Sequence, residues 1–169
     1  LIVDIRENEG GNSGFAEHFL AYLTTEPFAL IQAKEWKSSR RYRNYMRQRY
    51  GKVDSRLSEI ENGRTGWIEA RIVQPRPEEK RFTGPVCFLI GPLTYSSAVM
   101  IADAARFYHV GALIGEATGS APSAFGEMYP FELPATQLRG TVSTARFHGL
   151  TNPAPAAERP ITPEILVEP

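Results

Sequence analysis

A buried strand that runs into a proline turn and then into a serine-led helix constrains this chain most strongly. The apolar run Val86–Ile90 ends at Gly91-Pro92, which is typical of a buried strand that reaches a turn. Ser96 and Ser97 stand directly before a segment whose apolar residues recur every three or four positions, as in a helix with one buried face. Those positions are Ala98, Ile101, Ala102 and Ala105. Strand, turn and helix in this order predict part of a βαβ unit.

A serine at the start of such a helix can have one of two roles. It can cap the helix by accepting a hydrogen bond from a backbone N–H of the first turn. Alternatively, Ser96 can be a nucleophile on a strand-to-helix turn, where backbone N–H groups and the positive end of the helix stabilise an oxyanion. Capping is the commoner role, so the choice depends on the rest of the chain.

Two similar strand-to-turn passages occur elsewhere in the sequence. Leu1–Ile5, which has apolar residues at both odd and even positions, leads into a turn that contains Gly10-Gly11. The short apolar strand Gly111–Ile114 leads into Gly115–Gly119. The paired glycines either form a tight turn or expose backbone N–H groups to a ligand oxygen. Strands that alternate with helices through short turns favour an α/β fold with a mostly parallel sheet and crossover helices. The turn that contains Gly10-Gly11 and the turn that contains Ser96 should then meet at one edge of the sheet.

The remaining segments predict further elements within one domain over residues 1–169. We expect a helix over Phe15–Leu23 and short strands over Phe28–Ala33 and Trp67–Val73. From Phe125 onward the pattern changes to two extended segments, Phe125–Leu133 and Gln137–Phe147. The C-terminal part is therefore expected to be extended and rich in β-structure.

A basic stretch interrupts this pattern. Lys37–Lys52 carries seven basic residues, no acidic residue and three tyrosines. Basic residues interleaved with aromatic ones can mark a nucleic-acid surface. Acidic residues follow at once, however, and the net charge of the chain is zero, which gives no global field toward nucleic acid or anionic membrane. We interpret residues 35–62, approximately, as a solvated helical insertion and expect no nucleic-acid partner.

Composition argues against several other classes. The single cysteine, Cys87, lies in an apolar run, and one cysteine forms neither an internal disulfide nor a cysteine-based zinc site. No apolar run approaches the roughly 20 residues that span a bilayer. We expect no metal and no cofactor. Because the chain opens directly into a core strand at Leu1, we also expect it to be a fragment of a longer protein.

Four segments, in order, resemble the tail-specific or C-terminal-processing serine peptidases, peptidase family S41, which includes the tricorn protease core. Asp4–Gly11, DIRENEGG, is similar to the family pattern D-[LIV]-R-x-N-x-G-G. Thr94–Ala98, TYSSA, resembles T-[FY]-S-S/A-A, and Gly115–Gly119, GEATG, matches G-E-x-T-G. Pro160–Glu164, PITPE, is a weaker version of G-[IV]-x-P-D. Together they cover most of the chain except the basic insertion.

The resemblance implies a fold related to the Clp protease and crotonase folds, and hydrolysis of peptide bonds by a serine nucleophile, often near the C-terminus of a substrate. It assigns the nucleophile to Ser96. The oxyanion hole would be formed by the backbone N–H of Ser97 and that of Gly10 or Gly11. The same resemblance makes Thr118 and Gly119, in the third segment, candidate substrate-binding residues.

The chain departs from the family in its general base. The bacterial processing branch uses a lysine twenty-five residues after the serine, where this chain has Ala121. The tricorn-like branch uses a histidine upstream of the first strand, which would lie before Leu1. Glu158 stands one position out of register with the acidic residue that assists this histidine. Since a serine hydroxyl without a base is a poor nucleophile, we expect the base upstream of this chain.

The chain's own histidines offer little as substitutes. His18 is interpreted as a surface residue of the first helix. His109, at the far end of the serine helix, lies about 20 Å along the helix from Ser96, which is too far for proton transfer. His148, in the late extended region, stays open as a base within the chain.

Three functions therefore stay open. The first is a serine peptidase fragment that acts on a peptide or protein substrate. The second is a non-catalytic peptide-binding module that kept the fold and lost the base. The third is a crotonase-like acyl-group enzyme, whose oxyanion hole also uses backbone amides and needs no serine. The resemblance further implies an upstream segment or PDZ-like domain and an exported, periplasmic or cell-envelope location; it leaves the oligomeric state open.

Overall fold

The structure is a computed structural model that describes residues 1–151 and 159–167. The chain divides into two compact units, each continuous in space but not in sequence. Unit 1 comprises Leu1–Gln32, Ala70–Ala124 and His148–Pro169, and unit 2 comprises Ala33–Glu69 and Phe125–Phe147. The single domain expected over residues 1–169 stays a prediction, because two such units can belong to one domain.

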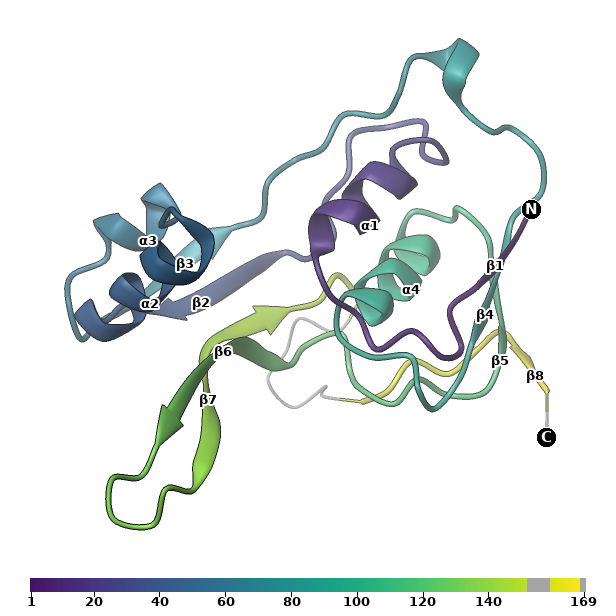
Figure 1. Cartoon of the computed structure of the whole chain (residues 1–169). Helices are drawn as coiled ribbons and strands as arrows, with labels where there is room; N and C mark the ends of the chain where they lie inside the picture. The colour runs from purple at the N-terminus through teal and green to yellow at the C-terminus, as the bar shows by residue number, and fades with distance from the viewer. Residues whose placement is uncertain (152–158, 168–169) are drawn as a thin grey trace. The chain divides into compact units, whose positions relative to one another are not determined.

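Unit 1 is built on a four-stranded sheet in the order β1-β4-β5-β8 (Figure 1). Its strands are β1 Ile2–Asp4, β4 Cys87–Ile90, β5 Ala112–Gly115 and β8 Ile165–Leu166. Every neighbouring pair in this sheet is parallel. The predicted α/β fold with a parallel sheet is thus confirmed, and the proline-rich tail supplies its last strand.

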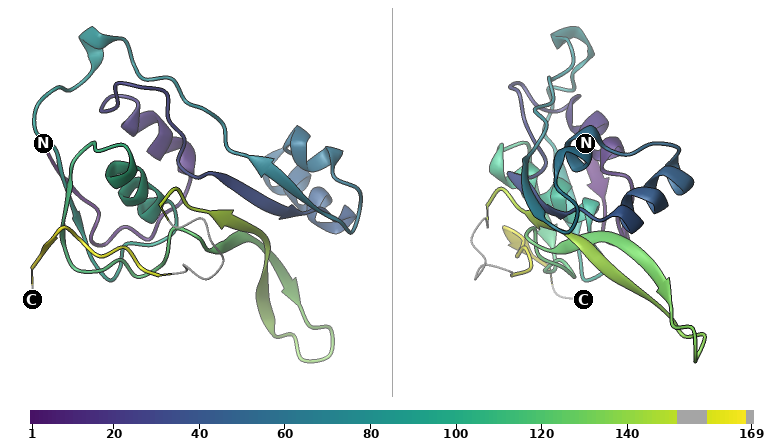
Figure 2. Two further views of the ribbon diagram at one scale, coloured as in Figure 1. Left: turned by 180° about the vertical axis from the view of Figure 1, so that it is seen from behind. Right: turned by 90° about the vertical axis from the view of Figure 1, so that its left-hand side faces the viewer.

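Two helices cover this sheet, α1 Ser13–Leu20 and α4 Ser97–Phe107, and a short 3₁₀ turn, η1 Glu78–Lys80, lies in the long connection to β4. The helices pack on each other and lie on the same side of the sheet (Figures 1 and 2). The small residues of α4 are fully buried, which lets the helix approach the sheet closely. Its buried alanines include Ala102, Ala104 and Ala105, and they pack in one core with Phe88, Ile90 and Leu113.

Unit 2 contains a second four-stranded sheet in the order β3-β2-β7-β6. Its strands are β2 Ala33–Lys37, β3 Thr65–Glu69, β6 Phe125–Glu132 and β7 Arg139–His148. β6 and β7 form an antiparallel hairpin, where two extended segments were predicted. The strand predicted over Phe28–Ala33 is wrong: Phe28 makes only an isolated bridge with Val73, and the ladder with β3 begins at Ala33. Phe28 and Leu30 are instead buried in the core of unit 1.

The predicted helical insertion, residues 35–62, contains helices α2 Arg40–Tyr50 and α3 Ser55–Glu59 in unit 2. The Ser39 hydroxyl caps α2 by accepting the Tyr42 N–H at 3.1 Å, and Gly51 ends it in the left-handed conformation. Tyr42 is buried in a core with Trp36 and Leu57, and this burial raises the pKa of Tyr42 to about 12. The helix therefore has a packed aromatic side as well as a charged one. Within the described residues, no helix combines the length and apolar character needed to cross a membrane.

Candidate active site

Three loops of unit 1 follow the carboxyl ends of adjacent parallel strands. They are residues 5–11 after β1, 91–96 after β4 and 116–120 after β5. The Ile5 N–H donates to the Leu89 carbonyl at 2.9 Å, and the Glu116 N–H donates to the Ile90 carbonyl at 3.1 Å. These bonds continue the sheet ladder beyond the strands, so the three loops begin side by side, as the parallel topology predicts.

Thr94 connects all three loops. It is fully buried, and its hydroxyl donates to the Ile5 carbonyl at 2.8 Å while accepting the Gly91 N–H at 3.0 Å. Its carbonyl accepts the Gly119 N–H at 3.1 Å. The sequence alone predicts no role for Thr94. A hydroxyl residue between a buried strand and an apolar helix was the available signal, because buried hydroxyls require partners.

Ser96 occupies a strained backbone position at the start of α4. Its φ is 53° and its ψ is −124°, a region that residues with a Cβ adopt at a cost of about 1–3 kcal/mol. Its side chain is exposed and makes no capping hydrogen bond to the first turn of the helix. The capping role is therefore not the one that this structure shows. A strained, exposed serine at a helix N-terminus is the arrangement that presents a nucleophile.

The first glycine of the pair lies directly against this turn. A Cβ atom on Gly10, which has a φ of 98°, would come within 2.6 Å of the Ser96 Cβ and 2.9 Å of the Ser97 nitrogen. Only glycine allows this approach. The Gly10 N–H, however, donates to the Asn8 side-chain oxygen at 2.9 Å, so it is already engaged.

The second glycine is more open. Gly11 has a φ of 136°, and no atom lies within 4 Å of the position where its Cβ would be. Among the described residues, neither Gly11 nor Ser97 donates its backbone N–H to another residue. Of the two glycines that were predicted as alternatives, Gly11 thus has the backbone donor that is available for an oxyanion.

Asn8 joins the loop that carries Gly10 and Gly11 to the turn that carries Ser96, residues 94–97, which we call the serine turn. Its carbonyl accepts the Tyr95 N–H at 3.0 Å, and its own N–H donates to the Ile5 carbonyl at 3.2 Å. Together with the bond from its side chain to Gly10, these contacts fix the loop after β1. Asn8 belongs to the segment Asp4–Gly11, but no local pattern in that segment predicts this role. Side-chain oxygens of asparagine commonly shape turns in this way.

The loop after β5, residues 116–120, packs against the residues that precede Ser96. Thr118 is buried, and its hydroxyl donates to the Ser120 carbonyl at 2.7 Å and accepts the Ile161 N–H at 2.9 Å. A Cβ on Gly119 would lie 2.1 Å from the Pro92 carbonyl oxygen and 2.2 Å from the Tyr95 ring. Both residues thus have packing roles, and substrate binding by them stays a prediction.

Ser120, which the sequence analysis did not single out, faces the serine turn. Its hydroxyl accepts the Ser96 N–H at 3.4 Å. The contact is long, but it is directed at the strained residue. The neighbouring Ala121, at the position where the bacterial branch has lysine, brings no ionisable group.

A buried carboxylate on α4 anchors the chain that leaves β7. Asp103 is fully buried and accepts the Leu150 N–H at 2.7 Å, the Thr151 N–H at 3.4 Å and the Thr151 hydroxyl. Such donors offset the cost of burying a polar side chain. Glu158, the candidate assisting acid, lies outside the described residues.

None of the described contacts supplies Ser96 with a base. The Nδ1 atom of His18 lies 2.8 Å from the Arg76 guanidinium, and His109 follows the opposite end of α4 from Ser96. His148 is buried at the end of β7, and its carbonyl accepts the Gln32 N–H at 2.8 Å. Its role as a base stays a prediction. Across residues 1–151 and 159–167, no group of three His, Cys, Asp or Glu side chains is arranged to hold a metal ion.

Asp4, at the end of β1, carries a carboxyl whose pKa is strongly lowered for a structural reason. The Arg6 guanidinium donates two hydrogen bonds to Asp4, at 3.0 and 2.7 Å, and these lower the pKa of Asp4 to about 2. The pair is exposed. It stiffens the start of the glycine loop and offers no group that titrates near neutral pH.

Comparison with known families gives one match over nearly the whole chain. Residues 1–162 match the sequence model described as peptidase family S41. A search of curated protein sequences finds no match.

Solved structures match the fold at low sequence identity. Mature CPAF aligns with a TM-score of 0.67 and 16% identity over 98% of this chain and 38% of its own. A proposed peptidase from Parabacteroides merdae gives 0.66 and 17% over 99% and 44%. The photosystem II D1 C-terminal processing protease gives 0.57 and 17% over 99% and 34%. The chain thus spans less than half the length of these three proteins.

Proposed function

Because this chain belongs to peptidase family S41, we propose that it is the nucleophile-bearing part of a serine peptidase, with Ser96 as the nucleophile. The observation that carries the proposal is the conformation of Ser96, which combines a positive φ with an uncapped, exposed side chain. Backbone strain of this size persists only where the surrounding structure enforces it, and it concentrates at functional sites.

The proposed reaction begins with attack of the Ser96 hydroxyl oxygen on the scissile carbonyl carbon. A general base accepts the hydroxyl proton as the new C–O bond forms, and the carbonyl oxygen becomes an oxyanion. The N–H groups of Ser97 and Gly11 donate to this oxygen, at the positive end of α4. The tetrahedral intermediate then expels the amine, which takes the proton from the base, and water hydrolyses the acyl-enzyme.

We assign the general base to a part of the protein upstream of Leu1, as in the tricorn-like branch. Two observations support this assignment. The chain has Ala121 at the position where the bacterial branch has its lysine, and the described contacts bring no histidine to Ser96. Glu158 is retained as the candidate acid that would orient an upstream histidine.

The substrate is proposed to be a peptide or protein. By likeness to the D1 C-terminal processing protease, we propose cleavage near a C-terminus, although that protein shares only its fold with this chain. Export to the cell envelope is proposed from the family resemblance. A lipoprotein from Streptococcus agalactiae also has this fold, with a TM-score of 0.51 and 15% identity.

The alternative with structural support is a peptide-binding module of the same fold. It is favoured by the lack of a base among the described contacts of Ser96, since serine alone is a weak nucleophile. The crotonase-like alternative predicts no role for Ser96 itself, and the strain at this residue argues against it.

Fluorophosphonate labelling tests the proposal. This chain and a version extended upstream would be treated with the reagent, and the adduct located by peptide mass spectrometry, with Ser96→Ala as the negative control and the exposed Ser13→Ala as the matched one. An adduct on Ser96 in the extended chain alone supports a peptidase with an upstream base. An adduct in both places the base within this chain. Labelling in neither contradicts the peptidase and favours the binding module.

A further inference from the structure

The α2 face of unit 2 carries positive charge that the chemistry proposed for Ser96 does not use. Unit 2 contains twelve basic and seven acidic residues, a net charge of +5, whereas the rest of the chain contains seven basic and twelve acidic, a net charge of −5. Five of the basic residues are the arginines of α2. In the described part of unit 2, the ion pairs found join other residues and none of them includes an α2 arginine.

One face of α2 lines a groove against the β6–β7 hairpin. Arg41, Asn44 and Gln48 stand at positions i, i+3 and i+7 of the helix and therefore share a face. The groove has a volume of about 380 Å³ and is completed by Tyr45, Tyr129 and Pro130. Its lining presents a guanidinium, two side-chain amides and aromatic rings, and it contains no carboxylate.

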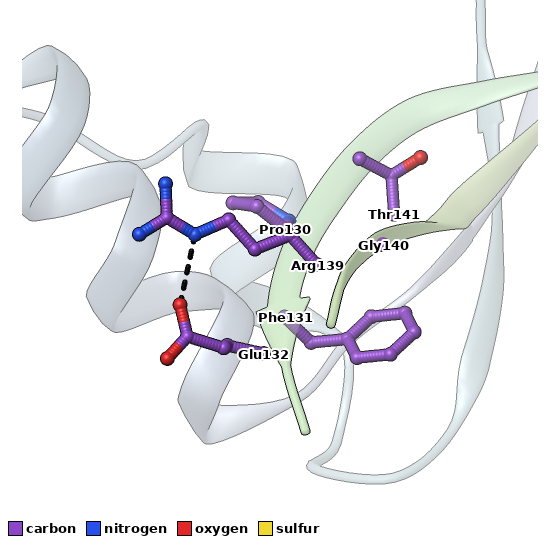
Figure 3. Close-up of a pocket in the computed structure, with 6 residues that line it drawn as sticks. All are labelled: Pro130, Phe131, Glu132, Arg139, Gly140 and Thr141. Atoms are coloured by element: carbon purple, nitrogen blue, oxygen red, sulfur yellow. Dashed lines mark hydrogen bonds and ion pairs between the residues drawn. The ribbon is translucent and has the colours of Figure 1, made fainter. Parts of the chain in front are cut away.

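A second hollow, of about 620 Å³, lies along the hairpin and shares Pro130 with the first (Figure 3). Its single carboxylate, Glu132, accepts a hydrogen bond from the Arg139 Nε at 2.8 Å, drawn as a dashed line in Figure 3. The Phe131 ring is 43% exposed and lies over Gly140, where a Cβ would come within 2.8 Å of it. Further exposed apolar side chains of the hairpin segment are Leu133, Leu138 and Val142.

We propose that this α2–hairpin face binds an extended acidic peptide segment whose carboxylates alternate with apolar side chains. That the segment belongs to the substrate rests on the peptidase function proposed above. Arg41 pairs with a carboxylate of the peptide, and guanidinium–carboxylate pairs are the strong, directional form of such contacts. Asn44 and Gln48 offer hydrogen bonds to the peptide backbone, and the apolar side chains pack on Phe131 and Pro130.

The packing of the tyrosines favours a peptide over a nucleic acid. Binding of single strands relies on aromatic faces that are free to stack with bases. Tyr42 is buried, and the Tyr45 and Tyr129 rings pack edge to face with centroids 5.5 Å apart. Arg43 is turned inward, since it donates to the Ser38 hydroxyl and the Ile60 carbonyl. The exposed apolar side chains of the hairpin can pack against apolar side chains of a peptide, but they offer nothing to the phosphates of a nucleic acid.

The test is a fluorescence anisotropy titration at about 50 mM salt, where exposed charges are weakly screened. The protein is the Ser96→Ala chain, so that cleavage does not intervene, and the probe is a labelled peptide of alternating glutamate and leucine. We expect Arg41→Glu to weaken binding at least about tenfold, equivalent to one carboxylate contact. Arg40→Glu makes the same charge change on the same helix outside the groove, and we expect less than about a threefold effect. A peptide with glutamine for glutamate should also bind about tenfold more weakly.

A second variant tests the apolar part. Phe131→Ala should weaken binding of the leucine-bearing peptide and leave binding of a glutamate–serine peptide unchanged. If Arg41→Glu and Arg40→Glu weakened peptide binding equally, binding would reflect the overall positive charge of α2, and the proposed site would be overturned. Equal binding of the glutamine peptide, or tighter binding of an oligonucleotide of the same charge, would also overturn it.

Labelling of Ser96 in the wild-type chain, extended upstream, is measured in parallel and separates the two proposals. Selective peptide binding without Ser96 labelling would remove the peptidase function and the substrate assignment but leave the binding face. Labelling of Ser96 without selective binding would remove the binding face and leave the peptidase.

Discussion

The serine turn of unit 1 and the α2–hairpin face of unit 2 are made from different kinds of groups. The serine turn and the loops beside it depend mainly on backbone geometry: glycines allow close approach, Ser96 is strained, and one buried hydroxyl, that of Thr94, joins two of the loops. The α2–hairpin face is made from side chains that project from a helix and a hairpin. Backbone geometry of this kind tolerates few substitutions, whereas an exposed side-chain surface tolerates many. Variants in the two regions should therefore differ in the size of their effects.

Gly10→Ala should have the largest effect. The added Cβ would lie 2.6 Å from the Ser96 Cβ and 2.8 Å from the Tyr95 carbonyl oxygen, at a φ of 98°. We expect a loss of about 2–4 kcal/mol in the free energy of unfolding, from collision and strain together. In the chain extended upstream, which is used for all the labelling comparisons below, fluorophosphonate labelling of Ser96 should fall at least about 100-fold, because displacement by an ångström can cost that much in rate.

The matched control for Gly10→Ala is Gly63→Ala in unit 2. Gly63 also has a positive φ, 87°, but no atom lies within 4 Å of the added Cβ. Gly63→Ala should lower the free energy of unfolding by only about 1 kcal/mol and leave labelling of Ser96 unchanged. If the two variants were equally stable in urea denaturation and equally labelled, the close contact between Gly10 and Ser96 would be refuted.

Thr94→Val ranks second. The substitution keeps the shape of the side chain but leaves the Gly91 N–H without its hydroxyl partner, while the Ile5 carbonyl keeps only the bond from the Asn8 N–H. Unsatisfied buried groups cost about 1–3 kcal/mol, and labelling of Ser96 should fall because three loops share this residue. Thr94→Ser keeps the hydroxyl and should recover most of the labelling. Failure of serine to do better than valine, measured by urea denaturation and labelling rate, would contradict the connecting role.

Ser120→Ala should have a smaller effect, confined to the nucleophile. The variant removes the acceptor of a single long bond from the Ser96 N–H, so the change in stability should stay below about 1 kcal/mol. We expect the labelling rate to fall about threefold, since the bond supports the strained conformation. An unchanged rate would show that the fold alone holds Ser96.

Acid titration tests the smallest contribution, the exposed Asp4–Arg6 pair. The folded-state pKa of Asp4, about 2, lies below its usual value of about 3.9. Asp4 therefore stabilises the folded chain above pH 4, and this stabilisation disappears as the pH falls from 4 to 2. Urea denaturation should show wild type more stable than Asp4→Asn at pH 6, with the difference shrinking steadily as the pH falls toward 2. A difference that stays constant from pH 6 to pH 2 would exclude the ionic origin.

The parts of the site that the sequence predicted are those with local signals. A buried strand, a turn and a periodic helix predicted a serine at the start of a helix, with capping and attack both open. The family resemblance favoured attack by Ser96, and parallel topology agreed with its placing of Gly10 or Gly11 nearby. Thr94 and Asn8 were missed, because their partners lie up to 89 residues away in the chain and no local pattern reports such pairs. The preference for Gly11 over Gly10 as an oxyanion donor also needed coordinates, since it depends on one hydrogen bond from Gly10 to Asn8.

The fold was predictable where the hydrophobic period was clear, and less so elsewhere. The strands of the parallel sheet lie where apolar runs were found, but Phe28 and Leu30 were mistaken for strand residues. A short apolar run has the same appearance whether it forms a ladder or fills a core. The aromatic side of α2 was missed for a related reason, because seven basic residues concealed that Tyr42 is buried.

The opposite charges of the two units have a consequence for the behaviour of the protein in solution. A molecule with no net charge near pH 7 lacks the mutual repulsion that keeps molecules apart. Here the +5 segments of one molecule can also attract the −5 segments of another. Salt screens such attraction over a Debye length of about 10 Å at 0.1 M. Solubility should therefore increase as salt is added, and low-salt buffers near neutral pH should favour precipitation.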